Sequence, residues 1–180
     1  MPVDDGEGIV ARLGSRDPEV VKQAAFDAAD MARVDAVPSL LKLLEAGDLA
    51  TMGAVAYALG ELQAEQARPR LMELLKDART AGRRGSLMYA MMCLDCKDHF
   101  HDMLAFLFDD SFEVRCKAAM ILEATAGDMA VDALVASRSE LAKRLREGAE
   151  EDDDRRAEVE AVLETLSEEI RRRESELEGE

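Results

Sequence analysis

Two cysteines and two histidines lie close together in one short segment of this chain. Within nine residues the sequence places four side chains that bind metals readily, which are Cys93, Cys96, His99 and His101. Thiolate and imidazole groups bind Zn²⁺, and Cys-x-x-Cys commonly supplies two of its ligands. These donors are closer together in the sequence than in the usual structural zinc motifs, so the chain would have to turn tightly to bring all four onto one ion. The segment is a candidate zinc site; the alternative is two partly buried thiols and two polar turn residues.

The rest of the sequence offers no recognisable catalytic motif. It contains no glycine-rich phosphate loop, no Gly-x-Ser-x-Gly turn and no His-Glu-x-x-His helix. Tyr57 and Tyr89 recur at equivalent positions of a repeated pattern, which is more typical of packing between repeats than of a catalytic pair. We therefore predict no catalytic residues and no enzymatic activity.

The composition limits the classes of partner. Among 180 residues there are 23 Lys and Arg against 39 Asp and Glu, which gives a formal charge of −16. This charge repels the phosphates of nucleic acids and of anionic membranes, so we expect neither as a partner. It favours a protein or peptide partner, basic ones included. The three cysteines are an odd number and predict no disulfide framework, so we expect a cytoplasmic protein. We expect no cofactor apart from the candidate zinc.

The hydrophobic residues repeat at a regular interval, and internal repeats of this kind are the signature of stacked structural units. Residues 36–44 match residues 67–75, and the same apolar pattern returns at 99–107. The first two copies open with Pro38 and Pro69, and a helix accepts proline in its first turn. An alanine-rich segment precedes these copies, so each unit is predicted to be a hairpin of an Ala-rich helix A and a Leu-rich helix B. Stacked hairpins bury the apolar stripes that a single hairpin would expose.

These patterns predict an all-α fold, namely an α-solenoid of about four helical hairpins with a charged C-terminal capping helix. Aromatic residues make up only 4% of the chain, and its abundant alanine and leucine favour helix over strand. The solenoid is expected over residues 1–146. Its predicted units are about 17–47, 48–79, 80–110 and 111–146.

Residues 147–180 are predicted to form an acidic capping helix and tail. Within them an apolar stripe recurs at helical spacing, at Val159, Val162, Leu163, Leu166 and Ile170. The stripe either covers the last hairpin or pairs with the same helix of a second chain. The protein is accordingly expected to be a monomer or a homodimer through this helix.

The repeats resemble the HEAT repeat family, especially the short bacterial repeats of phycobilin-lyase-like proteins. The resemblance rests on Asp17–Ala25 (DPEVVKQAA), on Glu113–Ala119 (EVRCKAA) and on the helix B pattern of Val37–Leu44, and it covers roughly residues 8–145. It implies an α-solenoid whose B helices line a concave face. Together with the absence of catalytic motifs, the repeats predict a scaffold or adaptor that binds a protein or peptide on that face without catalysis.

The expected partner-binding surface combines the outward positions of the B helices with aromatic residues of the third repeat and with Phe112, which is expected in the loop just after it. Phe108 occupies the position at which the other repeats place Lys76 and Glu45, so an exposed aromatic side chain is expected where the others are charged. The predicted partner-binding residues are Lys42, Glu45, Arg70, Glu73, Lys76, Asp102, Phe106, Phe108 and Phe112.

Two other functions stay open. The family resemblance alone implies a chromophore-lyase-like subunit that loads a bilin onto an acceptor protein. The cluster of Cys93, Cys96, His99 and His101 would instead suit a metal-binding regulator, with zinc as its cofactor.

Overall fold

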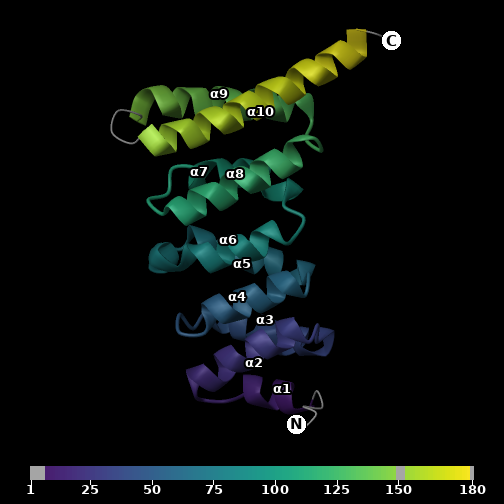
Figure 1. Ribbon diagram of the computed structural model, residues 1–180, viewed down its shortest axis with the longest axis vertical. Helices are drawn as coiled ribbons and strands as arrows, with labels where there is room; N and C mark the ends of the chain where they lie inside the picture. Colours follow the sequence, from purple (N-terminus) through teal and green to yellow (C-terminus); the bar gives the residue numbers. More distant parts are fainter. Residues whose placement is uncertain (1–6, 149–152, 179–180) are drawn as a thin grey trace. The chain divides into compact units, whose positions relative to one another are not determined.

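The computed structural model describes residues 7–148 and 153–178, and every regular element in these ranges is a helix (Figure 1). The prediction of an all-α fold is confirmed. The α-helices are α1 (Glu7–Leu13), α2 (Pro18–Asp30), α3 (Val37–Ala46), α4 (Met52–Glu61), α5 (Arg68–Lys76), α6 (Arg84–Met92), α7 (Phe100–Phe106), α8 (Phe112–Ala126), α9 (Val131–Gly148) and α10 (Asp153–Glu178). They follow the predicted alternation, with α2, α4, α6 and α8 as A helices and α3, α5, α7 and α9 as B helices.

Short polar side chains and prolines determine where several of these helices begin. The carboxylate of Asp17 accepts a hydrogen bond of 2.9 Å from the backbone N–H of Glu19 in α2. The hydroxyl of Ser111 accepts one of 3.4 Å from the backbone N–H of Val114 in α8. Both bonds satisfy amide groups that the first turn of a helix leaves unpaired. The two prolines that were predicted to open B helices lie in the first turns of α3 and α5.

The turn from helix A to helix B has the same backbone conformation in the first two hairpins. Ala32 and Gln63, which occupy equivalent positions of successive repeats, have left-handed φ angles of 50° and 49°. A short 3-10 turn then leads into helix B, at Val34–Ala36 before α3 and at Glu65–Ala67 before α5. Residues other than glycine rarely adopt a left-handed φ. Because this rare φ recurs at equivalent positions, the backbone conformation of the turn repeats as the sequence does.

The helices form two compact units, which are described separately. Unit 1 ends at Asp95 and contains α1 to α6, whereas unit 2 begins at Cys96 and contains α7 to α10. The third predicted hairpin is divided between them, because α6 belongs to unit 1 and α7 to unit 2. The capping helix α10 belongs to the same unit as α7, α8 and α9.

In unit 1 the A helices lie side by side, with α2 against α4 and α4 against α6 (Figure 1). Small residues line these contacts. Gly60 of α4 lies so close to α6 that a methyl group on it would be 2.9 Å from the Cα atom of Ala90. The first helix, α1, packs on α2 and α3 and buries Ile9 and Leu13 there. The core of unit 1 is thus a seam of small and aliphatic side chains between successive hairpins.

In unit 2 the apolar stripe of α10 packs on α8 and α9. Val159, Val162 and Leu166 are fully buried, and Ile170 is 2% exposed. Leu163, the fifth residue of the stripe, is half-buried. The prediction of a charged capping helix is confirmed, since its apolar face covers the last hairpin of its own chain.

An ion pair joins α10 to α8 beside this stripe. The Nε atom of Arg115 lies 2.6 Å from the carboxylate of Glu158, and the two side chains are only 5% and 15% exposed. Arg115 also donates hydrogen bonds to the backbone carbonyls of Asp109 and Asp110. Because a charge this buried is stable only with well-placed partners, the pair helps to fix the position of α10 on α8.

The contact at Gly60 gives a direct test of the packing in unit 1. An added methyl group would overpack the seam at a cost of about 1–3 kcal/mol, which exceeds the roughly 0.5–1 kcal/mol that alanine gains over glycine inside a helix. Gly60→Ala should therefore lower the free energy of unfolding by about 1 kcal/mol, as measured by urea denaturation.

Gly82→Ala is the matched control, because nothing lies within 4 Å of the methyl group that it adds. Its free energy of unfolding should stay within about 0.5 kcal/mol of the wild-type value. A Gly60→Ala variant as stable as the wild type would contradict the close approach of α4 and α6.

Candidate functional site

Three aromatic rings line up across the A helices of unit 1, one from each helix. Phe26 of α2 lies 5.6 Å from Tyr57 of α4, measured between ring centroids, with the ring planes tilted by 59°. Tyr57 lies 5.3 Å from Tyr89 of α6, with the planes only 20° apart. We call these three residues the aromatic ladder. The prediction that the two tyrosines pack between repeats is confirmed.

The ladder lies at the surface rather than in the core. Phe26 is 41% exposed, and both tyrosines are half-buried. Exposed aromatic side chains that gather in one place are typical anchors for a partner, because their contact with water is unfavourable and their rings lose little freedom on binding. The ladder is therefore the most prominent candidate interaction surface in unit 1.

Acidic side chains surround the hydroxyl ends of the two tyrosines. The Tyr89 hydroxyl donates a hydrogen bond to the carboxylate of Glu61. This bond, together with burial, raises the pKa of Tyr89 well above its usual value. The pKa of Tyr57 is also raised, first by the negative charge of Glu61 and then by burial and by Asp30. The local electrostatic potential is therefore negative at this end of the ladder.

Cys93 lies beside Tyr89. Burial is the main cause that raises the pKa of its thiol, and the charge of Glu61 adds to it, while a hydrogen bond with Tyr89 acts in the opposite direction. A raised pKa leaves little thiolate at neutral pH. The environment of Cys93 is that of a packing residue at the edge of the ladder.

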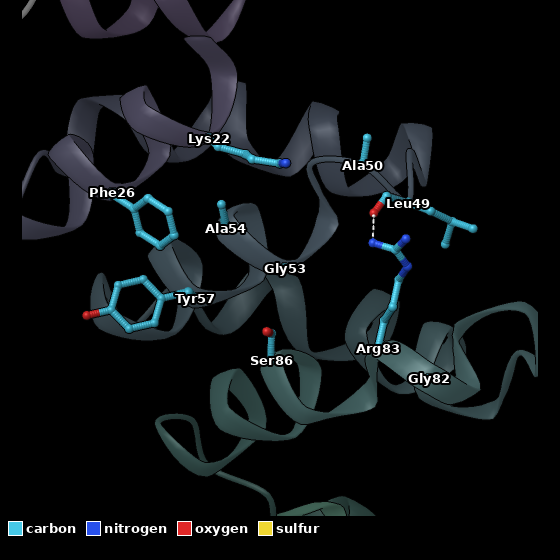
Figure 2. A pocket seen from close by; sticks show the side chains of 10 residues that line it. All are labelled: Lys22, Phe26, Leu49, Ala50, Gly53, Ala54, Tyr57, Gly82, Arg83 and Ser86. Atoms are coloured by element: carbon cyan, nitrogen blue, oxygen red, sulfur yellow. Dashed lines mark hydrogen bonds between the residues drawn. The ribbon is translucent and has the colours of Figure 1, made fainter. Parts of the chain in front are cut away.

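Next to the ladder, unit 1 contains an open hollow of about 460 Å³ (Figure 2). The rings of Phe26 and Tyr57 line one side of it, and Gly53 with Ala54 of α4 leaves the space between the helices unfilled. Its full lining is Lys22, Phe26, Leu49, Ala50, Gly53, Ala54, Tyr57, Gly82, Arg83 and Ser86.

The two cations at this hollow already have partners. The Lys22 ammonium lies 2.7 Å from the carboxylate of Glu19. The guanidinium of Arg83 donates a hydrogen bond of 2.8 Å to the backbone carbonyl of Leu49, which is drawn in Figure 2. The hollow is thus bordered by aromatic rings and by cations that are paired or hydrogen-bonded.

The predicted residues of the B-helix face in unit 1 also come together, around Arg70. The guanidinium of Arg70 lies 2.8 Å from the carboxylate of Glu73 and 3.6 Å from that of Glu45. Lys42, one turn of α3 before Glu45, lines a second and smaller hollow of about 240 Å³ beside α1. Lys76, the last residue of α5, is exposed. The charges of this face largely pair with one another.

The predicted aromatic residues of unit 2 do not form one surface. Phe106 is 6% exposed, so its assignment to the binding surface is wrong; it lies on the buried face of α7 and belongs to the core. Phe108 is half-buried, and the guanidinium of Arg144 lies over its ring at 4.0 Å from the centroid. Phe112 is 62% exposed, but it is the first residue of the A helix α8 rather than part of a B helix or a loop.

The side chains of the candidate zinc cluster have other neighbours. Cys96 is buried, His99 pairs with the carboxylate of Asp102 at 3.3 Å, and exposed His101 lies 3.4 Å from Glu140. In the part of the chain that the structure describes, no three side chains of His, Cys, Asp or Glu are grouped so that they could hold a metal ion. The zinc site stays a prediction that the observed geometry does not support.

Two residues of interest were missed by the sequence reasoning, although the repeat contains the signal for them. Phe26 lies one repeat before Tyr57, and Met120 lies one repeat after Tyr89. Extending the register of the tyrosines in both directions would have found them. Met120, which occupies this position in α8, is 53% exposed. A large apolar or aromatic side chain that is at least partly exposed therefore recurs at the same position in all four A helices.

Comparison with known families agrees with the helical hairpins and their period. Residues 6–92 match the family of HEAT repeats. This part of the chain belongs to the HEAT repeat family. The match covers the segment from α1 to the end of α6, which includes the whole aromatic ladder and the hollow beside it.

Two solved structures of engineered proteins have the same fold as this chain. The first has a TM-score of 0.63 and 24% identity, and the alignment covers 89% of this chain and 47% of that one. The chain thus spans about half the length of that protein. The second has a TM-score of 0.56 and 18% identity, with coverages of 91% and 96%. At these identities the likeness concerns the fold alone.

No curated protein matches the chain in sequence. Across residues 7–148 and 153–178, none of the helices has both the length and the apolar character needed to cross a membrane.

The two tyrosines, which are the only ones in the chain, allow the ladder to be tested by titration. Because both pKa values are raised, the folded protein should form tyrosinate at a higher pH than the unfolded chain, whose tyrosines ionise near pH about 10. The folded state favours the protonated hydroxyls, so this contribution to stability is complete below about pH 10 and is lost as the pH rises through the folded-state values.

Glu61→Gln should shift the tyrosinate absorbance curve to lower pH, because it removes the charge beside both hydroxyls. Glu123→Gln in unit 2, at an exposed position, is the matched control and should leave the curve unchanged. Identical curves for Glu61→Gln and the wild type would contradict the contact between Glu61 and the ladder.

Proposed function

We propose that this HEAT repeat protein is a non-catalytic interaction module, and that the aromatic ladder and its hollow receive a segment of a partner protein. The observation that carries the proposal is the line of partly exposed rings formed by Phe26, Tyr57 and Tyr89. Such a surface gains free energy when a partner covers it, at about 25 cal/mol for each Å² of apolar surface removed from water.

The hollow determines what the partner presents. Phe26 and Tyr57 form an aromatic wall, and the glycine and alanine of α4 leave room beside it. An aliphatic or aromatic side chain of the partner would fill this space and contact the rings. Since interface energy concentrates in a few well-packed anchors, one such side chain would supply much of the affinity.

The charges beside the ladder favour a basic segment. Asp30 and Glu61 are both exposed, and they raise the pKa of Tyr57 through their negative charge. A lysine or arginine next to the apolar anchor would pair with these carboxylates. The charge of −16 on the whole chain would also speed the approach of a basic partner.

The residues that line the hollow do not suit catalysis. Ser86 contributes a hydroxyl, but the described part of the lining contains no histidine or carboxylate that could activate it as a nucleophile. Lys22 and Arg83 are held by Glu19 and by the carbonyl of Leu49. These features favour binding over bond-making.

The B-helix face is the competing location for the same function. A partner that bound there would have to compete with the contacts of Arg70 to Glu45 and Glu73. At the aromatic ladder a partner would cover rings without displacing an ion pair, and Glu61, which accepts a hydrogen bond from Tyr89, can accept another from a basic side chain. This is why we favour the ladder. Binding through Lys42, Glu45, Arg70, Glu73 and Lys76 stays a prediction, and the experiment below separates the two faces.

A library of displayed random peptides, selected on the full-length protein, tests the proposal. We expect enrichment of peptides with an apolar residue next to lysine or arginine. Phe26→Ser should weaken the binding of an enriched peptide at least tenfold in a fluorescence anisotropy titration, because it removes the most exposed ring of the ladder. The fold should be retained, since Phe26 is 41% exposed.

Val34→Ser is the matched control, because Val34 is an apolar residue of unit 1 that is even more exposed, at 70%. This variant should bind like the wild type. Arg70→Gln should also leave the affinity unchanged if the ladder is the site. Loss of binding with Arg70→Gln, and not with Phe26→Ser, would overturn the proposal in favour of the B-helix face.

A further inference from the structure

The second unit contains a basic groove in an otherwise acidic chain. A hollow of about 520 Å³ lies between α9 and α10. Arg138, Ser139, Ala142 and Arg146 of α9 line it, with Leu163 and Ser167 of α10 on the other side. We call this the α9–α10 groove. Among the described residues, its lining has two guanidinium groups and no carboxylate.

The two arginines of this groove differ from others in unit 2. Arg115, Arg172 and Arg173 each pair with a glutamate. Among residues 7–148 and 153–178, the side chains of Arg138 and Arg146 have no ion pair or hydrogen bond. Arg144 and Arg171 also have no carboxylate partner among these residues, but they contact the ring of Phe108 and the backbone carbonyl of Ser167. Among the described residues of unit 2, the side chains of Arg138 and Arg146 are therefore the arginines available as cations.

The charge of α9 supports this interpretation. The helix carries four basic side chains and three acidic ones, so it is slightly positive within a protein of charge −16. The helix α10 on the other side is acidic, with ten acidic and five basic side chains, but neither Glu164 nor Glu168, the sequence neighbours of Leu163 and Ser167, is among the described lining residues. Repulsion from acidic residues farther away is weak, because at physiological salt charges are screened beyond about 8 Å. Contact pairs with a guanidinium are screened much less, and arginine can bind a carboxylate through two parallel hydrogen bonds.

The spacing of the arginines indicates the form of the ligand. They are eight residues apart, which corresponds to roughly 12 Å along a helix. The small side chain of Ala142 lies between them and leaves the groove open. Ser139 and Ser167 donate to backbone carbonyls one turn earlier, and a hydroxyl can rotate toward an incoming oxygen. A single small anion would reach one arginine, whereas a peptide can reach both.

We propose that the α9–α10 groove binds an acidic peptide segment of a partner protein, whose carboxylates pair with Arg138 and Arg146. The apolar part of the segment lies on Leu163, which is half-buried and forms part of the groove lining. This ligand is opposite in charge to the one proposed for the aromatic ladder. The two sites are in different units, and neither proposal depends on the other.

The test uses a fluorescein-labelled helical peptide with two glutamates eight residues apart, measured by anisotropy at physiological salt with the full-length protein. An isomer of the same composition with adjacent glutamates is the control probe. We expect saturable binding of the first peptide and at least tenfold weaker binding of the second. The double variant Arg138→Gln with Arg146→Gln should weaken binding of the first peptide at least tenfold.

Lys143→Gln is the matched control, because it removes one positive charge from α9 at a residue that does not line the groove and is 67% exposed. It should change the affinity less than twofold. Phe26→Ser should have no effect, so failure at this site and failure at the aromatic ladder can be told apart.

Three results would overturn the proposal. The first is a dissociation constant above about 1 mM for the spaced peptide. The second is an equal loss of affinity with Lys143→Gln, which would indicate attraction to the general charge of α9. The third is concentration-dependent self-association that the arginine substitutions abolish, because the acidic ligand would then be a second copy of this chain.

Discussion

Unit 1 depends on how closely its A helices approach one another. Gly60 of α4 faces the backbone of Ala90 in α6 so closely that even one methyl group would not fit between them. Helices of ten and nine residues are too short to be stable alone. Their stability therefore comes from packing against the neighbouring hairpins. The same approach brings the rings of Tyr57 and Tyr89 to 5.3 Å on the outer side of the helices.

The sequence was sufficient to predict the fold because the fold is periodic. Each hairpin repeats an alanine-rich helix followed by a leucine-rich helix, and the first two share a proline at the start of helix B, so every copy supports the interpretation of the others. The capping helix could also be predicted, because a stripe of apolar residues on a charged helix has to be covered. The division of the chain after Asp95 was not predicted, because it follows from contacts between helices rather than from the repeat.

The candidate site was harder to predict, for a physical reason. A repeat register indicates which side of a helix a residue occupies, but not which neighbour covers it. Phe108 lies under Arg144 of α9, and Arg115 of α8 pairs with a glutamate of α10. Phe106 and Phe112 were assigned to one surface, yet one is buried and the other begins α8. The aromatic ladder was visible in part, since the two tyrosines repeat, but Phe26 completes it only when the register is extended to α2.

The two proposals together give the chain two binding surfaces of opposite charge, each for a different kind of protein segment. The ladder of unit 1 combines aromatic rings with carboxylates, and the groove of unit 2 combines arginines with hydroxyls. A repeat protein can carry such different surfaces because the core is built from the inward positions of each helix, which leaves the outward positions free to vary. This separation of core and surface explains why the fold reveals little about the partner.

The central claim is that α4 and α6 pack in the register that places Gly60 on Ala90 and Tyr57 on Tyr89. Nuclear Overhauser effects in a carbon-edited NMR spectrum of the full-length protein measure this most directly. The account predicts cross-peaks between the Gly60 Hα protons and the protons of Ala90, and between the rings of the two tyrosines. Assigned spectra in which both sets of cross-peaks are missing would contradict it.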